Sequence, residues 1–165
     1  MKELLTKISS YNLFNYLFPG ALFVVLLEKL THFSLRQDDL VLGVFFYYFL
    51  GLVISRMGSV FVEPALKKLR VVKFADYADY LPASKEDGLI ATLSEQNNMF
   101  RTLCSVMMCL GGAKIWEFYS LQYPWVIENM EAIVICGLGI LFVLAYRKQT
   151  AYISARVTRH TNKKN

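Results

Sequence analysis

Residues 40–62 read LVLGVFFYYFLGLVISRMGSVFV, a run of 23 residues in which Arg56 is the one charged side chain. A helix that crosses the hydrocarbon core of a bilayer needs about 20 predominantly apolar residues. Arg56 lies near one end of the run, where the long side chain of an arginine reaches the lipid headgroups. The run therefore predicts a membrane-spanning helix.

Three further apolar stretches flank this run, at residues 8–27, 99–119 and 125–146. The 165-residue chain as a whole is 55% hydrophobic and 19% charged, and its mean hydropathy is +0.37. Soluble domains carry about 25% charged residues, and a chain this rich in Phe, Tyr and Leu is not disordered. We therefore predict an all-α protein, a four-helix transmembrane bundle with helical cytoplasmic extensions.

The chain divides where the apolar stretches end. The predicted parts are an amphipathic N-terminal segment with the first transmembrane hairpin (residues 1–62), a cytoplasmic helical segment (63–98), a second transmembrane hairpin (99–146) and a basic cytoplasmic tail (147–165). With both termini and the helical segment on one side, that side holds 15 of the 18 Lys and Arg residues. Because Lys and Arg accumulate in cytoplasmic loops, we expect both termini to be cytoplasmic.

Small side chains recur every fourth residue in two of the predicted spans. They are Gly51, Ser55 and Ser59 in one span, and Ser105, Cys109 and Ala113 in the other. Membrane helices associate where small residues let their backbones approach, so the two stripes are expected to meet, although such residues also recur by chance in any membrane helix. Gly137 and Gly139 leave room for another close neighbour, from this chain or from a second subunit.

Besides Arg101, four charged residues lie inside the last two apolar stretches: Lys114, Glu117, Glu128 and Glu131. In an antiparallel hairpin that turns at residues 119–124, Lys114 and Glu131 lie at equal depth. An unpaired charge at that depth is costly, so we predict an ion pair between them, with Glu117 sharing the lysine three residues away. The four residues either form polar contacts that hold the two helices of the hairpin together or line a route for ions or protons.

The cytoplasmic segment 63–98 contains two sets of side chains that suggest contacts outside the chain. Cations directly follow the second span, where anionic lipid headgroups attract them; they are Lys67, Lys68, Arg70 and Lys73. An apolar stripe at helical spacing predicts a surface for a soluble cytoplasmic protein partner; it consists of Phe74, Tyr77, Tyr80 and Leu81. We expect Pro82 to end that helix and Ser84 to cap the next one.

Nothing in the sequence predicts an enzyme, a metal site or a cofactor. Cys104, Cys109 and Cys136 have the spacing of neither a disulfide framework nor a zinc knuckle. Arg156 and His160 resemble the Arg and His pair of HEPN ribonucleases, but their spacing is one residue too short. A basic tail is typical of the flank of a last membrane helix, so direct nucleic-acid binding is not expected.

Residues 9–20, SSYNLFNYLFPG, resemble the opening of small multi-span membrane proteins of bacterial antiphage defence, in particular the membrane subunits of Kiwa systems. The resemblance covers these dozen residues and the overall plan of the chain. It implies a homo-oligomer in the bacterial inner membrane that responds to phage attack and holds a soluble DNA-binding partner on its cytoplasmic side. We therefore expect a non-enzymatic scaffold or sensor. The alternative is a small oligomeric ion channel that depolarises the membrane.

Overall fold

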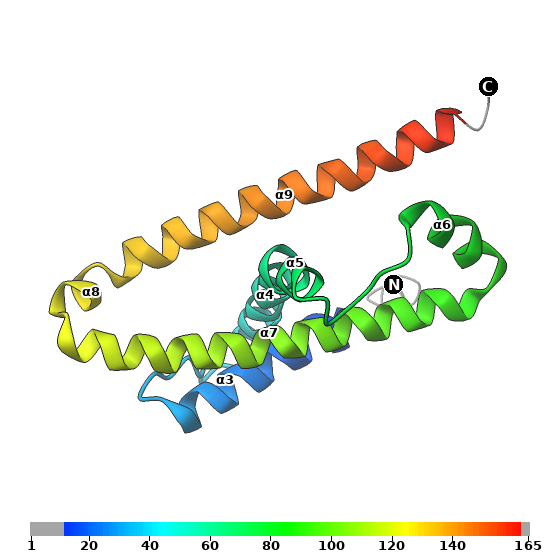
Figure 1. Ribbon diagram of the computed structural model, residues 1–165. Coiled ribbons are helices and arrows are strands. Elements are labelled where there is room, and N and C mark those ends of the chain that lie inside the picture. The colour runs from blue at the N-terminus through cyan, green and yellow to red at the C-terminus, as the bar shows by residue number, and fades with distance from the viewer. Residues whose placement is uncertain (1–11, 163–165) are drawn as a thin grey trace.

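The computed structural model describes residues 12–162, which are almost entirely helical (Figure 1). No strand occurs among these residues, so the all-α prediction is confirmed. The elements in chain order are η1 (Leu13–Leu17), α3 (Phe18–Leu30), α4 (Leu40–Met57), η2 (Gly58–Val62), α5 (Glu63–Lys68), α6 (Tyr77–Glu86), α7 (Gly88–Gln122), α8 (Pro124–Glu128) and α9 (Met130–Asn162). Residues 9–11, which begin the segment that resembles Kiwa membrane subunits, and residues 163–165 of the tail lie outside this range.

One long apolar helix is built from α4, η2 and α5, which follow one another without a break. It begins at Asp39, whose carboxylate accepts a hydrogen bond of 2.7 Å from the Leu42 N–H and so caps the helix. It ends before Arg70, whose φ of 58° places it in the left-handed region that often terminates helices. The Val71 N–H then bonds back to the Leu66 carbonyl at 3.0 Å.

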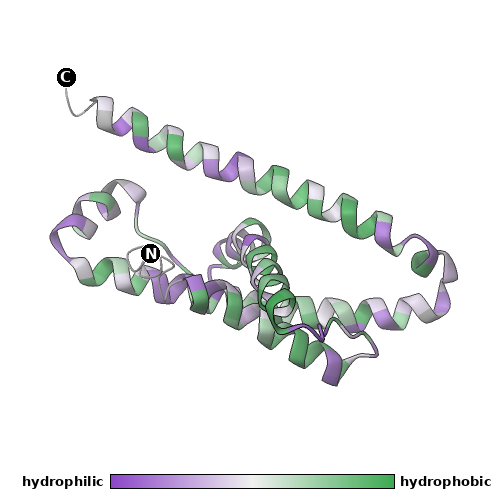
Figure 2. Ribbon diagram, turned by 180° about the vertical axis from the view of Figure 1, so that it is seen from behind, coloured by the Kyte–Doolittle hydropathy of each residue, from purple (hydrophilic) through white to green (hydrophobic). Residues whose placement is uncertain are grey.

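Two helices among the described residues are long and apolar enough to cross a membrane, Leu40–Lys68 and Met130–Arg159. Figure 2 shows the apolar residues concentrated along α4 and in the half of α9 that adjoins α8, whereas the C-terminal half of α9 is more polar. The structure therefore supports membrane association through two of the four predicted spans, and the four-helix transmembrane bundle is not confirmed.

The two longest helices, α7 with 35 residues and α9 with 33, are joined through α8 and diverge from each other (Figure 1). The helix formed by α4 and α5 is seen nearly end-on between them, so it crosses both. The main contacts of α9 are accordingly with α4, η2 and α8. The predicted hairpin, in which the last two apolar stretches lie side by side, is not the arrangement found.

The core lies where α3, α4 and α7 meet. Leu27, Ile54, Val106 and Leu110 are buried there against one another. Beside this core the backbones of η1 and α4 are in contact at Gly51. A Cβ atom at this position would lie 1.7 Å from the Tyr16 carbonyl oxygen, which leaves no room for a side chain. Such close approach of backbones is the usual mode of helix association in membranes.

The boundary between α6 and α7 differs from the sequence prediction. Pro82 lies inside α6, although a proline lacks the N–H that would bond to the carbonyl four residues before it. The Ser84 hydroxyl donates a hydrogen bond of 3.2 Å to the Leu81 carbonyl, as it does within a helix. Asp87 is the cap of α7, because its carboxylate accepts a 2.9 Å bond from the Leu89 N–H. The predicted break at Pro82 and cap at Ser84 were wrong.

Candidate functional site

A first polar cluster, the α3–α7 cluster, joins the end of α3 to the last third of α7. The Lys114 ammonium donates to a Glu117 carboxylate oxygen at 2.6 Å and to the Leu30 carbonyl at 2.9 Å. The other carboxylate oxygen of Glu117 accepts a 2.6 Å bond from the backbone N–H of His32. Glu117 therefore pairs with the lysine three residues away, as the spacing in the sequence suggests.

The predicted ion pair between Lys114 and Glu131 is not formed. Glu131 is exposed on α9, as is Glu128 on α8, and the ion pairs found in residues 12–162 include neither. The reason is the course of α9, which diverges from α7 instead of lying along it (Figure 1). Equal depth in a hairpin brings two charges together only if the two helices are neighbours.

A second polar cluster, the Glu63 cluster, joins three helices through one carboxylate. Glu63 is 7% exposed and lies within ion-pair distance of Arg101 on α7 at 2.7 Å, Lys67 on α5 at 3.0 Å and Lys148 on α9 at 3.4 Å. Lys148 also donates a hydrogen bond to the Ser59 carbonyl. Sequence reasoning did not single out Glu63. The available signal was an acidic residue placed directly after an apolar run and before a group of cations.

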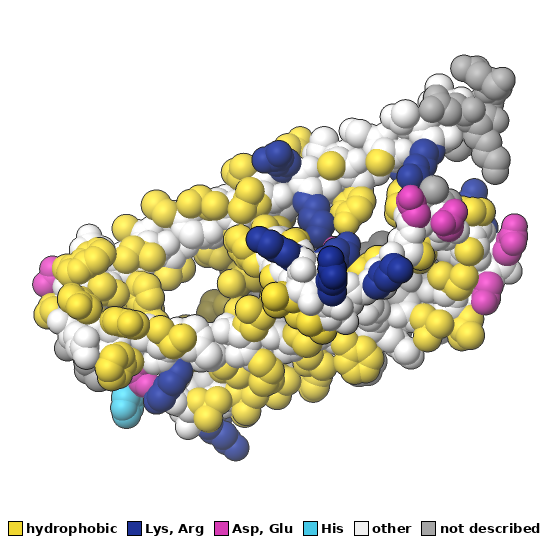
Figure 3. Space-filling model, viewed as in Figure 1, with side chains coloured by type: hydrophobic (Ala, Val, Ile, Leu, Met, Phe, Trp, Pro, Cys, Tyr) yellow, Lys and Arg dark blue, Asp and Glu magenta, His cyan; other side chains and the backbone are white. Residues whose placement is uncertain are grey.

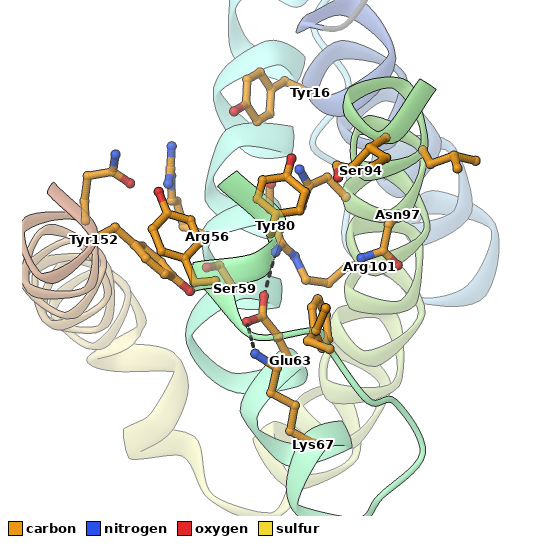
Figure 4. Close-up of a pocket in the computed structure, with 18 residues that line it drawn as sticks. Tyr16, Arg56, Ser59, Glu63, Lys67, Tyr80, Ser94, Asn97, Arg101 and Tyr152 are labelled. Carbon is orange, nitrogen blue, oxygen red and sulfur yellow. Dashed lines mark hydrogen bonds and ion pairs between the residues drawn. The ribbon is translucent and has the colours of Figure 1, made fainter. Parts of the chain in front are cut away.

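A cavity of about 840 Å³, the basic cavity, opens beside the Glu63 cluster (Figure 4). Three cations line it, Arg56, Lys67 and Arg101, against one carboxylate, that of Glu63. The remaining polar lining consists of hydroxyl and amide groups of Tyr, Ser, Asn and Gln side chains. Its volume is within the range of sites that hold small molecules, which is about 300–1,000 Å³.

The stripe predicted as a partner surface contributes to the wall of this cavity. Tyr77 stacks on Tyr80 with ring centroids 6.3 Å apart and contacts the Tyr152 ring at 6.2 Å, and all three line the cavity. Phe74 lines it too, with the Lys67 ammonium 4.0 Å from its ring centroid. Leu81 is half-buried. The tyrosine rings of the stripe are therefore engaged within the chain.

The cations predicted to meet anionic lipid gather around and after α5 (Figure 3). Lys68, Arg70 and Lys73 are exposed, whereas Lys67 is engaged by Glu63 and Phe74. Three of the four are thus free to face a charged surface.

The two stripes of small residues meet only in part. Ser55 accepts a 3.3 Å hydrogen bond from Thr102, Gly58 packs on Ser105, and Cys109 lies 3.7 Å from the sulfur of Met57. Three members lie elsewhere: Gly51 faces η1, Ala113 packs beside the core cluster, and Ser59 lines the basic cavity. The helices α4 and α7 therefore contact each other, but through a register that includes Met57 and Gly58.

Within residues 12–162 no group of three or more His, Cys, Asp or Glu residues is placed to hold a metal ion. Cys104, Cys109 and Cys136 are free thiols. Comparison with protein-family models, with characterised proteins and with solved structures finds no match for this chain.

Proposed function

We propose that this protein is a non-enzymatic membrane scaffold or sensor that forms a homo-oligomer and holds a soluble partner at its cytoplasmic face. Its four apolar stretches cross the bacterial inner membrane, with both termini in the cytoplasm. The resemblance of residues 9–20 to Kiwa membrane subunits suggests that its role is in antiphage defence.

The separation of the two polar clusters supports four crossings. The α3–α7 cluster joins the predicted outer ends of the first and third apolar stretches, through Leu30 and Lys114. The Glu63 cluster joins the predicted inner ends of the second, third and fourth stretches, through Glu63, Arg101 and Lys148. The buried apolar core lies between the two. Polar groups at both ends and apolar packing between them is what a bilayer requires of a spanning protein.

The observation that carries the scaffold function is apolar surface beyond the Glu63 cluster. Leu89 and Leu93 on α7 are more than half exposed, and so are Ile153 and Val157 on α9. Each pair is spaced by four residues and therefore lies on one helix face. Lipid covers such side chains within a crossing but not on a helix that has left the membrane. Exposed apolar faces in water mark contacts with other proteins.

Co-purification from the native host tests the scaffold function. In the double variant Ile153→Ser and Val157→Ser we expect the protein to stay in the membrane fraction and to lose its soluble partner. The matched control is Thr150→Ala, an exposed polar position on the same helix, which should retain the partner. A double variant that still captures the partner would refute this surface.

Two further measurements test the rest of the proposal. A reporter domain that is active only in the cytoplasm should be active when fused at the C-terminus, and one that is active only in the periplasm should be inactive. Activity of the periplasmic reporter would overturn the topology. Reconstituted protein should leave vesicles as tight to ions as empty ones. A leak that Glu131→Gln changes would replace the scaffold by the ion channel.

A further inference from the structure

We propose that the basic cavity binds a phosphate group, carried by a lipid headgroup or by a soluble phosphorylated molecule, with Arg56 and Arg101 as its ligands. This goes beyond the proposed function, because no partner protein takes part in the binding. The proposal follows from the charges of the cavity, the unused donors of the arginines and the composition of the walls.

The cavity carries more positive than negative charge. Glu63 is its one acidic lining residue and is already shared by Lys67, Arg101 and Lys148. Arg56 is half-buried, and the ion pairs found in residues 12–162 do not include it. A guanidinium that is partly removed from water and lacks an anionic partner in its surroundings attracts an anion from outside.

Arg101 adds a donor that has no acceptor within residues 12–162. One of its terminal nitrogens donates to Glu63 at 2.7 Å. Its Nε is buried and finds no hydrogen-bond acceptor within the described part of the chain. A buried donor without an acceptor costs about 1–3 kcal/mol, so Arg101 gains if its guanidinium turns this donor toward an anion in the cavity. The planar fork of an arginine matches the oxygens of a phosphate.

The walls of the cavity suit the rest of a phosphorylated ligand. Figure 4 shows Tyr80 beside Arg101, with Tyr152 reaching in from α9 on one side and Ser94 and Asn97 along α7 on the other. Hydroxyl and amide groups supply further donors for a group with several acceptor oxygens. The tyrosine rings provide flat surfaces for the moiety that carries the phosphate.

The position of the cavity makes a lipid one of the two sources. Ser55, Arg56 and Ser59 line it at the end of the apolar run of α4, and Arg101 lines it at the start of the apolar part of α7. In a membrane, such a level is that of the headgroups, where basic pockets between helices bind anionic lipid. A soluble phosphorylated molecule would enter the same cavity from the aqueous side.

The test is a titration of the full-length protein in neutral detergent, followed by its tryptophan and tyrosine fluorescence. The probes are short-chain phosphatidylglycerol for the lipid source, and ATP and inorganic phosphate for the soluble source. We expect saturable binding of at least one probe, and we expect Arg56→Gln to weaken it at least tenfold. Arg56→Lys, which keeps the charge without the fork, should lie between the wild type and Arg56→Gln.

The control variant is Lys85→Gln, an exposed cation of α6 that does not line the cavity. It should bind the probe within twofold of the wild type. Tyr80→Phe, which removes only a hydroxyl group, is a second variant expected to weaken binding should Arg56→Gln fail to fold. Absence of saturable binding by every probe, or equal losses in Arg56→Gln and Lys85→Gln, would overturn the proposal.

Discussion

Gly51 lies against the backbone of Tyr16 so closely that no side chain fits between the two helices. The Cβ of an alanine would be 1.7 Å from the Tyr16 carbonyl oxygen, and the obstacle is backbone rather than a flexible side chain. Because η1 and α4 must move apart to admit it, we expect Gly51→Ala to destabilise the protein by at least about 2 kcal/mol. Thermal unfolding in detergent measures this loss.

A glycine of α7 provides a control of opposite sign. A Cβ at Gly112 meets no atom within 4 Å in the described part of the chain. Alanine is the better helix former, by up to about 1 kcal/mol, so Gly112→Ala should leave the unfolding midpoint unchanged or raise it. Equal destabilisation by both alanines would show that the close crossing of η1 and α4 is not what holds these helices together.

The partners of individual charges could be predicted only where they are close in sequence. Glu117 and Lys114 are three residues apart on one helix, and the spacing alone indicated their contact. Glu63 and Arg101 are 38 residues apart and lie on different helices. No periodicity within either helix specifies that they meet, so the Glu63 cluster and the cavity beside it became visible only in the structure.

The hydropathy pattern predicted which long apolar helices form better than it predicted how these helices pack against one another. The runs at residues 40–62 and 125–146 lie largely within the two helices that are able to cross a membrane, because apolar length is a local property of the chain. How helices cross depends on contacts such as Gly51 with Tyr16. In the structure α4 lies across α7 and α9, and α9 does not lie along α7, so Lys114 and Glu131 are not neighbours as the predicted pairing required.

Two Glu→Gln substitutions distinguish the helix contacts found in the structure from those predicted from the sequence. Glu117→Gln removes the carboxylate that holds Lys114 and so loosens α7 from the end of α3. We expect it to lower the unfolding midpoint in detergent, whereas Glu131→Gln, at an exposed position of α9, should leave it unchanged. Equal losses in the two variants would instead support a hairpin in which Lys114 and Glu131 lie opposite each other.

In the molecule as a whole, α9 is a long helix that the rest of the described chain covers very little. Of the residues in the most apolar 18-residue window of the candidate span Met130–Arg159, 6% are buried. Gly137 and Gly139 have no atom within 4 Å of a Cβ position in the described residues. The close neighbour that these glycines suggest is therefore not supplied by residues 12–162 of the same copy. A second copy of the chain fits the proposed homo-oligomer, and lipid is the other possible covering.

A bulky residue at one of these glycines distinguishes the two coverings. If copies approach through α9, Gly139→Leu places a side chain where two backbones meet, and the detergent-solubilised protein should shift from oligomer to monomer in a mass measurement. The monomer itself should stay folded, since the position is open within the chain. Ile140→Leu, at an exposed neighbouring position, is the control and should keep the oligomeric mass, because one large apolar side chain replaces another. An unchanged mass in Gly139→Leu would mean that lipid, and not a second copy, faces this part of α9.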